Sequence, residues 1–213
     1  MFSTLFPLEA LILVIALSID AFVASFAYGT NKIRIPFLST IIISAICSGI
    51  LALSLIIGSV LSDFINANIT IAIGFVIMFL LGIIKLFDSS IKTLIRKNKN
   101  FKKEYKFTLF SLNFILNVYA DPEKADMDRS RLLSPVEAVS LAIALSLDGA
   151  IAGFGAGLLS GSIIQTVLFS FVIGACFIIA GYRLGNHISK KLSFDMSWIS
   201  GILLILLAFL KLL

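Results

Sequence analysis

Apolar residues fill six long stretches of the chain, separated by short polar segments and one long polar segment. The stretches span roughly residues 5–28, 37–61, 69–87, 135–158, 164–184 and 196–213. Each approaches or exceeds the roughly 20 residues that a helix needs to cross about 30 Å of hydrocarbon. Because lipid offers backbone groups no hydrogen-bond partner, continuous helices are the expected structure. The pattern predicts an all-α membrane protein with six transmembrane helices.

The first and fourth apolar stretches carry the same sequence pattern. PLEALILVIALSIDAFVASFAYG (7–29) aligns without gaps on PVEAVSLAIALSLDGAIAGFGAG (135–157). Equivalent positions, including weaker matches beyond these segments, are Ser18 and Ser146, Asp20 and Asp148, Gly29 and Gly157, Gly58 and Gly185, and Gly74 and Gly201. We interpret the match as a duplication of three helices.

An odd number of helices in each copy determines how the two copies are oriented. If the first copy starts on one side of the membrane, the second starts on the other, so the chain is predicted to fold as two inverted three-helix repeats. Residues 1–87 would form the first repeat, 88–134 a charged loop and 135–213 the second repeat. Inverted repeats are common in secondary transporters, whose ion sites lie at the repeat interface near the midplane of the bilayer.

Composition and charge agree with this interpretation. The chain is 59% hydrophobic and only 14% charged, whereas about a quarter of the residues in soluble domains are charged. In the predicted topology, 15 of the 17 Lys and Arg residues fall on one side of the membrane. The positive-inside rule makes that side cytoplasmic, with both termini outside. A basic loop beside a membrane is typical of topology and anionic-lipid contact, so we expect lipid and a small cation as partners and no nucleic acid.

Asp20 and Asp148 lie within apolar stretches, each 13 residues after the proline near the start of its stretch. A charged residue there costs about 2.5–3.5 kcal/mol on insertion scales and normally faces the bundle interior or a water-filled cavity. Small residues recur at every fourth position beside both aspartates, which favours close helix contact. We therefore expect the first and fourth helices to cross tightly, with both carboxylates facing a shared space.

Two carboxylates, joined by the nearby hydroxyls of Ser18 and Ser146, would form an oxygen-rich site. Such ligands suit hard divalent cations, and carboxylates also suit proton exchange. In the alternative interpretation, each aspartate bonds to a neighbouring helix and has only a structural role. No other cofactor is indicated beyond a divalent cation, manganese or calcium.

The paired motifs SIDAF (18–22) and SLDG (146–149), set in six short helices, resemble the MntP family of manganese efflux pumps. The chain resembles a related sporulation-associated branch even more closely. The resemblance implies manganese export, with Asp20 and Asp148 handling the ion and Asp88 matching an acidic residue late in the third helix. The exporters also have an acid in the second helix, where this sequence reads CSGIL (47–51).

The end of the charged loop admits two interpretations. Residues 126–137 match an EF-hand calcium loop, with Arg131 at the position that usually requires glycine. The ligands would be Asp126, Asp128, Ser130, Ser134 and Glu137, with the backbone carbonyl of Leu132. Alternatively, Ser134-Pro135-Val136-Glu137 is a capping box that begins a helix. Metal bound here would lie on the cytoplasmic side.

Two functional hypotheses follow from these features. The first is export of a small divalent cation by alternating access around Asp20 and Asp148. The second is a non-transporting, sporulation-associated membrane protein whose cytoplasmic loop binds calcium or a partner. The sequence contains no nucleophile–base pairing, Gly-rich phosphate loop or His/Cys metal cluster, so we do not expect an enzyme.

Overall fold

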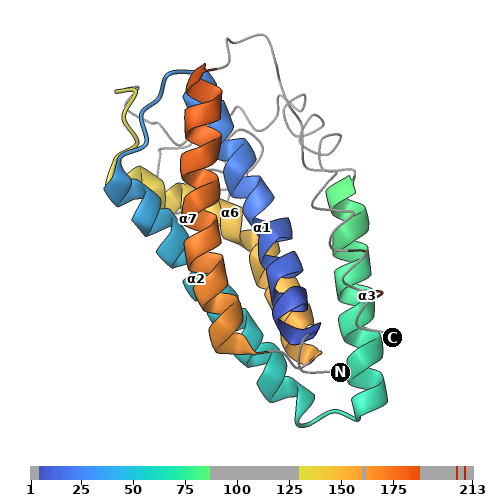
Figure 1. Ribbon diagram of the computed structural model, residues 1–213. Helices are drawn as coiled ribbons and strands as arrows, with labels where there is room; N and C mark the ends of the chain where they lie inside the picture. Colours follow the sequence, from blue (N-terminus) through green and yellow to red (C-terminus); the bar gives the residue numbers. More distant parts are fainter. Residues whose placement is uncertain (1–4, 87–129, 160–161, 188–204, 206–208, 210–213) are drawn as a thin grey trace, which may run out of the picture.

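The computed structural model describes residues 5–86, 130–159 and 162–187, together with residues 205 and 209. Its helices in these ranges are α1 (Leu5–Thr30), α2 (Phe37–Ser62), α3 (Ala67–Leu86), α6 (Pro135–Leu158) and α7 (Ile163–His187) (Figure 1). Among the described residues, α1, α2, α6 and α7 are each long and apolar enough to span a membrane, and α3 contains a shorter apolar segment, Asn68–Ile84. The all-α prediction is confirmed for this part of the chain. The predicted stretch 196–213 lies almost wholly outside it.

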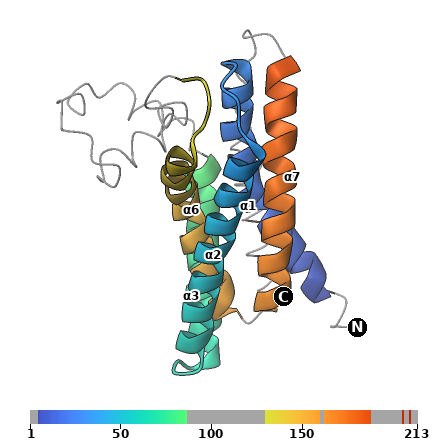
Figure 2. The ribbon, with the colours of Figure 1, turned by 90° about the vertical axis from the view of Figure 1, so that its left-hand side faces the viewer.

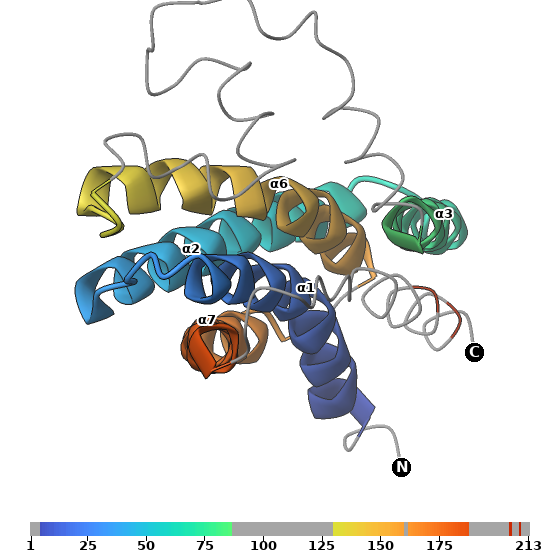
Figure 3. The same ribbon diagram turned by 90° about the horizontal axis from the view of Figure 1, so that it is seen from above.

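The long helices pair across the two halves of the chain. α1 packs along α7, and α2 packs along α6 (Figures 2 and 3). α2 also contacts α7, and α3 packs on α6, whereas α1 and α6 barely touch. The expected tight crossing of the first and fourth helices is therefore wrong. The first helix of each half instead packs on the second helix of the other half.

Glycines explain this pairing, because they allow the helix backbones to touch. A Cβ atom added at Gly185 of α7 would meet the Phe26 carbonyl of α1, and one added at Gly58 of α2 would meet the Phe154 carbonyl of α6. Gly29 and Gly157 lie at the same two crossings, where added Cβ atoms would meet the carbonyls of Tyr182 and Leu55, respectively. The small residues do bring helices together as predicted, but α6 meets α2 rather than α1.

The four long helices differ in how much of their surface is covered by protein. Within their apolar windows, 61% of α1 and 56% of α6 are buried, but only 33% of α2 and 11% of α7. Large exposed apolar side chains on α2 and α7 include Leu53, Ile57, Val60, Ile164, Leu168 and Val172. A surface of this kind is stable against lipid rather than water. The protein is therefore a multi-pass membrane protein.

Main-chain hydrogen bonds join the two halves at one end of the bundle. The Arg34 amide donates to the Arg131 carbonyl at 2.8 Å, and the Leu133 amide donates to the Arg34 carbonyl at 2.9 Å. The Ser39 hydroxyl donates to the Leu133 carbonyl at 2.7 Å. The Leu133 side chain is fully buried. The connection between α1 and α2 is thus tied to the segment that leads into α6.

A capping box begins α6, as one of the two sequence interpretations predicted. The Ser134 side chain accepts a hydrogen bond from the Glu137 amide, and the Glu137 carboxylate accepts one from the Ser134 amide at 2.9 Å. Pro135 occupies the first helical position, where its missing N–H has no cost. Glu137 therefore has a structural role that requires no metal.

Candidate ion site

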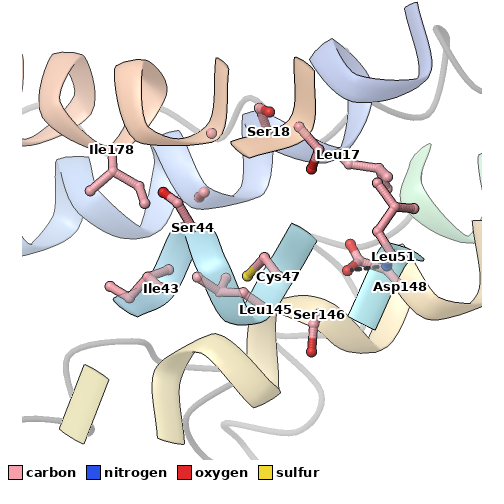
Figure 4. Close-up of a pocket in the computed structure, with 14 residues that line it drawn as sticks. Leu17, Ser18, Ile43, Ser44, Cys47, Leu51, Leu145, Ser146, Asp148 and Ile178 are labelled. Atoms are coloured by element: carbon pink, nitrogen blue, oxygen red, sulfur yellow. Dashed lines mark hydrogen bonds between the residues drawn. The ribbon is translucent and has the colours of Figure 1, made fainter. Parts of the chain in front are cut away.

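A cavity of about 40 Å³ lies between α1, α2, α6 and α7 (Figure 4). This volume can hold a water molecule or a small cation. Most residues that line it form equivalent pairs under the sequence repeat: Leu17 and Leu145, Ser18 and Ser146, Ala21 and Gly149, Ile43 and Ser170, Cys47 and Gly174, and Leu51 and Ile178. The pairs between α2 and α7 follow the match of Gly58 with Gly185. Ser44 and Asp148 complete the lining.

Asp148 supplies the carboxylate of this cavity. It comes from the middle of α6, and its side chain is only 7% exposed. One carboxylate oxygen, Oδ1, accepts a hydrogen bond from the Gly149 amide at 2.8 Å (Figure 4). A buried carboxylate in a membrane-spanning helix is costly unless it binds a partner, which makes Asp148 the strongest ion-binding candidate.

Hydroxyl and thiol groups also line the cavity. Ser18 and Ser146 both line the cavity, as the repeat suggested, and the Ser146 hydroxyl donates to the Ile143 carbonyl of its own helix at 2.9 Å. α2 adds Ser44 and Cys47, and the Cys47 thiol donates to the Ala142 carbonyl at 3.6 Å. The cavity therefore offers mainly oxygen ligands, with one thiol.

Asp20 occupies a different position from its sequence equivalent. It is buried in α1, with 8% exposure, and its neighbours Leu17, Ser18 and Ala21 line the cavity. Asp20 itself does not line it. The structure thus brings Asp148, Ser18 and Ser146 to one cavity and places Asp20 beside its wall.

The remaining predicted site residues lie elsewhere. Asp88, Asp126 and Asp128 lie outside the described residues. The Ser130 hydroxyl donates to the Leu132 carbonyl at 3.0 Å, and Ser134 pairs with Glu137 in the capping box. Within the described ranges, no three His, Cys, Asp or Glu residues are arranged to hold a metal ion. Calcium binding at 126–137 stays a prediction.

Known proteins similar to this chain identify its family. Residues 91–213 match the family described as "Putative manganese efflux pump". Over 208 residues, the chain is also 33% identical to "Probable sporulation protein YtaF" of Bacillus subtilis (strain 168), covering 95% of this chain and 97% of that protein. The chain belongs to the MntP family. No solved structure matches this MntP-family chain significantly.

The sequence interpretation missed three polar residues that line the cavity of this MntP-family protein, Ser44 and Cys47 of α2 and Ser170 of α7. Ser44 and Cys47 lie three residues apart on α2, and Leu51 follows four residues later, so all three share one helix face. The pattern was visible in the sequence. However, none of these side chains carries a formal charge, so none stood out within an apolar helix.

Proposed function

We propose that the protein moves a small divalent cation across the membrane by alternating access around Asp148 and Asp20. The observation that carries this proposal is the buried Asp148 carboxylate at a cavity lined by all four long helices. Membership of the MntP family supports transport as the activity. Carboxylate and hydroxyl oxygens suit a hard divalent ion such as manganese, and the family description supports export.

The proposed architecture has six transmembrane helices, arranged as two inverted three-helix repeats. Two observations support it. The crossing of α1 with α7 and that of α2 with α6 use equivalent glycines, and the cavity lining consists largely of equivalent pairs. Both patterns are expected if a two-fold axis passes through the cavity. Asp20 is then the counterpart of Asp148, and an exchange of conformations between the repeats would bring it to the site.

The proposed orientation places both termini outside and the 88–134 loop in the cytoplasm. Lys32 and Arg34 lie in the segment that is hydrogen-bonded to Arg131, so three basic residues meet at one end of the bundle. The positive-inside rule assigns such an end to the cytoplasm. In this orientation, Asp88 and the 126–137 loop would act on the cytoplasmic side.

Cation flux in proteoliposomes tests the transport proposal. Purified protein is assayed with a panel of Mn²⁺, Mg²⁺, Ca²⁺ and Zn²⁺, and wild type is compared with Asp148→Asn, Asp20→Asn and the double variant. Asp63→Asn is the matched control, because Asp63 is an exposed aspartate that follows α2. We expect flux of at least one divalent ion in wild type and the control, and a loss of about tenfold or more when either intramembrane carboxylate is removed.

A second function is favoured by the name of the Bacillus relative. "Probable sporulation protein YtaF" agrees with a non-transporting membrane protein whose loop binds calcium or a partner during sporulation. In that case, Asp20 and Asp148 would only hold helices together. If wild type and the double variant, both folded, gave equal flux that was no greater than in protein-free liposomes, the second function would be supported and the first excluded.

A further inference from the structure

Ser44 is an unusual hydroxyl for a residue inside a helix. Its side chain is only 2% exposed and lines the cavity, yet its Oγ atom has no hydrogen-bond partner among the described residues. Several other helical hydroxyls bond to a carbonyl of the preceding turn, as Ser48 does to Ala45 at 3.1 Å and Ser25 to Ala21 at 2.6 Å. A buried hydroxyl left without a partner is unfavourable, so the Ser44 hydroxyl indicates a group that is bound in the cavity.

The position of Ser44 indicates what kind of group binds there. Ser44 and Asp148 line the same cavity, and the carboxylate there favours a positively charged ligand. The repeat equivalent of Ser44 on α7 is Phe171, which offers no ligand atom. Hydroxyls of Ser18, Ser146 and Ser170 also line the cavity. Its asymmetry lies in Ser44, whose repeat equivalent is apolar, and in Asp148, whose repeat equivalent does not line the cavity.

We propose that Ser44 Oγ and the Asp148 carboxylate bind the same divalent cation, and that Ser44 helps to select a hard ion. This inference rests on the proposed transport function, because it places a further ligand at the same site. A hydroxyl oxygen is a hard ligand, whereas a thiol in its place is soft and favours thiophilic ions. The cavity volume of about 40 Å³ fits an ion that has shed most of its water.

Replacing Ser44 with alanine or cysteine separates a ligand from a structural residue. The full-length protein in detergent is titrated with Mn²⁺ and with Cd²⁺, and the same variants are assayed for flux of both ions. Ser48→Ala and Ser48→Cys are the matched controls, because Ser48 is buried on the same helix but bonds to its own backbone. Both controls retain Cys47, so any binding of Cd²⁺ by that native thiol is common to all the variants.

The expected result is a change in ion preference confined to position 44. Ser44→Ala should weaken Mn²⁺ binding by about tenfold, in line with the loss of one interaction with a charged group. It should also raise the KM for Mn²⁺ flux more than it lowers kcat. Ser44→Cys should shift the ratio of Cd²⁺ to Mn²⁺ affinity by about tenfold or more towards Cd²⁺. The Ser48 variants should retain the wild-type affinities and ratio.

Three outcomes decide between the proposals. If the Ser44 and Ser48 variants bind both ions alike while Asp148→Asn abolishes flux, the Ser44 inference is overturned and the transport function stands. If wild type binds Mn²⁺ through Ser44 but moves no ion, the transport function fails and the ligand assignment holds. If wild type neither binds nor moves any ion of the panel, both are overturned.

Discussion

Because the helix backbones touch where they cross, alanine in place of a glycine at a crossing should lower the free energy of unfolding. A Cβ atom at Gly157 would meet the Leu55 carbonyl and lie 3.0 Å from the Leu55 carbonyl carbon and Cα. These are backbone atoms, so α2 and α6 must separate to make room. Overpacking of this kind costs about 1–3 kcal/mol, although alanine otherwise favours a helix over glycine by about 1 kcal/mol. We therefore expect Gly157→Ala to lower the free energy of unfolding by up to about 2 kcal/mol after this offset, and to be about 1–3 kcal/mol less stable than an alanine variant at a glycine with open space around it.

The control for this prediction lies on α2. Gly49 has open space around the position of an added Cβ, so Gly49→Ala should leave the free energy of unfolding unchanged or raise it by up to about 1 kcal/mol. Gly185→Ala should behave like Gly157→Ala, because an added Cβ would meet the Phe26 carbonyl at the other crossing. Reversible unfolding by SDS in mixed micelles measures all three variants. If Gly157→Ala proved as stable as Gly49→Ala, the inferred backbone contact between α2 and α6 would be wrong.

Three further predictions concern the ends of the bundle. Ser134→Ala removes the capping box of α6 and should cost about 1 kcal/mol in the same unfolding assay; an unchanged stability would show that the cap contributes nothing. A reporter fused after Leu213 should be found outside the cell, and a cytoplasmic signal would overturn the orientation. Calcium titration of the whole protein should show millimolar or tighter binding that is lost in the Asp126→Asn/Asp128→Asn variant if the EF-hand prediction holds; no calcium-dependent signal at millimolar calcium would dismiss it.

The helices were predictable because their signals are local. The length of each apolar stretch is enough to predict the described helices. The capping box of Ser134 and Glu137 predicts where α6 begins. Helix partners were not predictable from the same signals. The glycine at position 157 shows that α6 presents a face for close contact, but not that Leu55 of α2 would occupy it. Which helix packs against this face of α6 depends on how all the helices pack together.

The candidate site was predictable only in part, for a related reason. Asp148 stands out because a charge in an apolar helix is costly, and the repeat drew attention to Ser18 and Ser146. Serine is common in membrane helices as a small packing residue, and its hydroxyl can bond to the backbone of its own helix. Neither Ser44 nor Cys47 therefore stands out as a ligand in the sequence. Only the folded arrangement distinguishes Ser44, which faces the cavity without such a bond to the described residues, from Ser48, which makes one.

In the proposed mechanism, the Asp148 carboxylate binds the transported cation. Counterflow tests it most directly: proteoliposomes loaded with unlabelled Mn²⁺ are placed in a trace of radioactive Mn²⁺, and label accumulation is followed for wild type, Asp148→Asn and Asp63→Asn. We expect transient accumulation in wild type and Asp63→Asn, and about tenfold less or none in Asp148→Asn. Equal accumulation in all three folded proteins, or none in wild type with any ion of the panel, would contradict it.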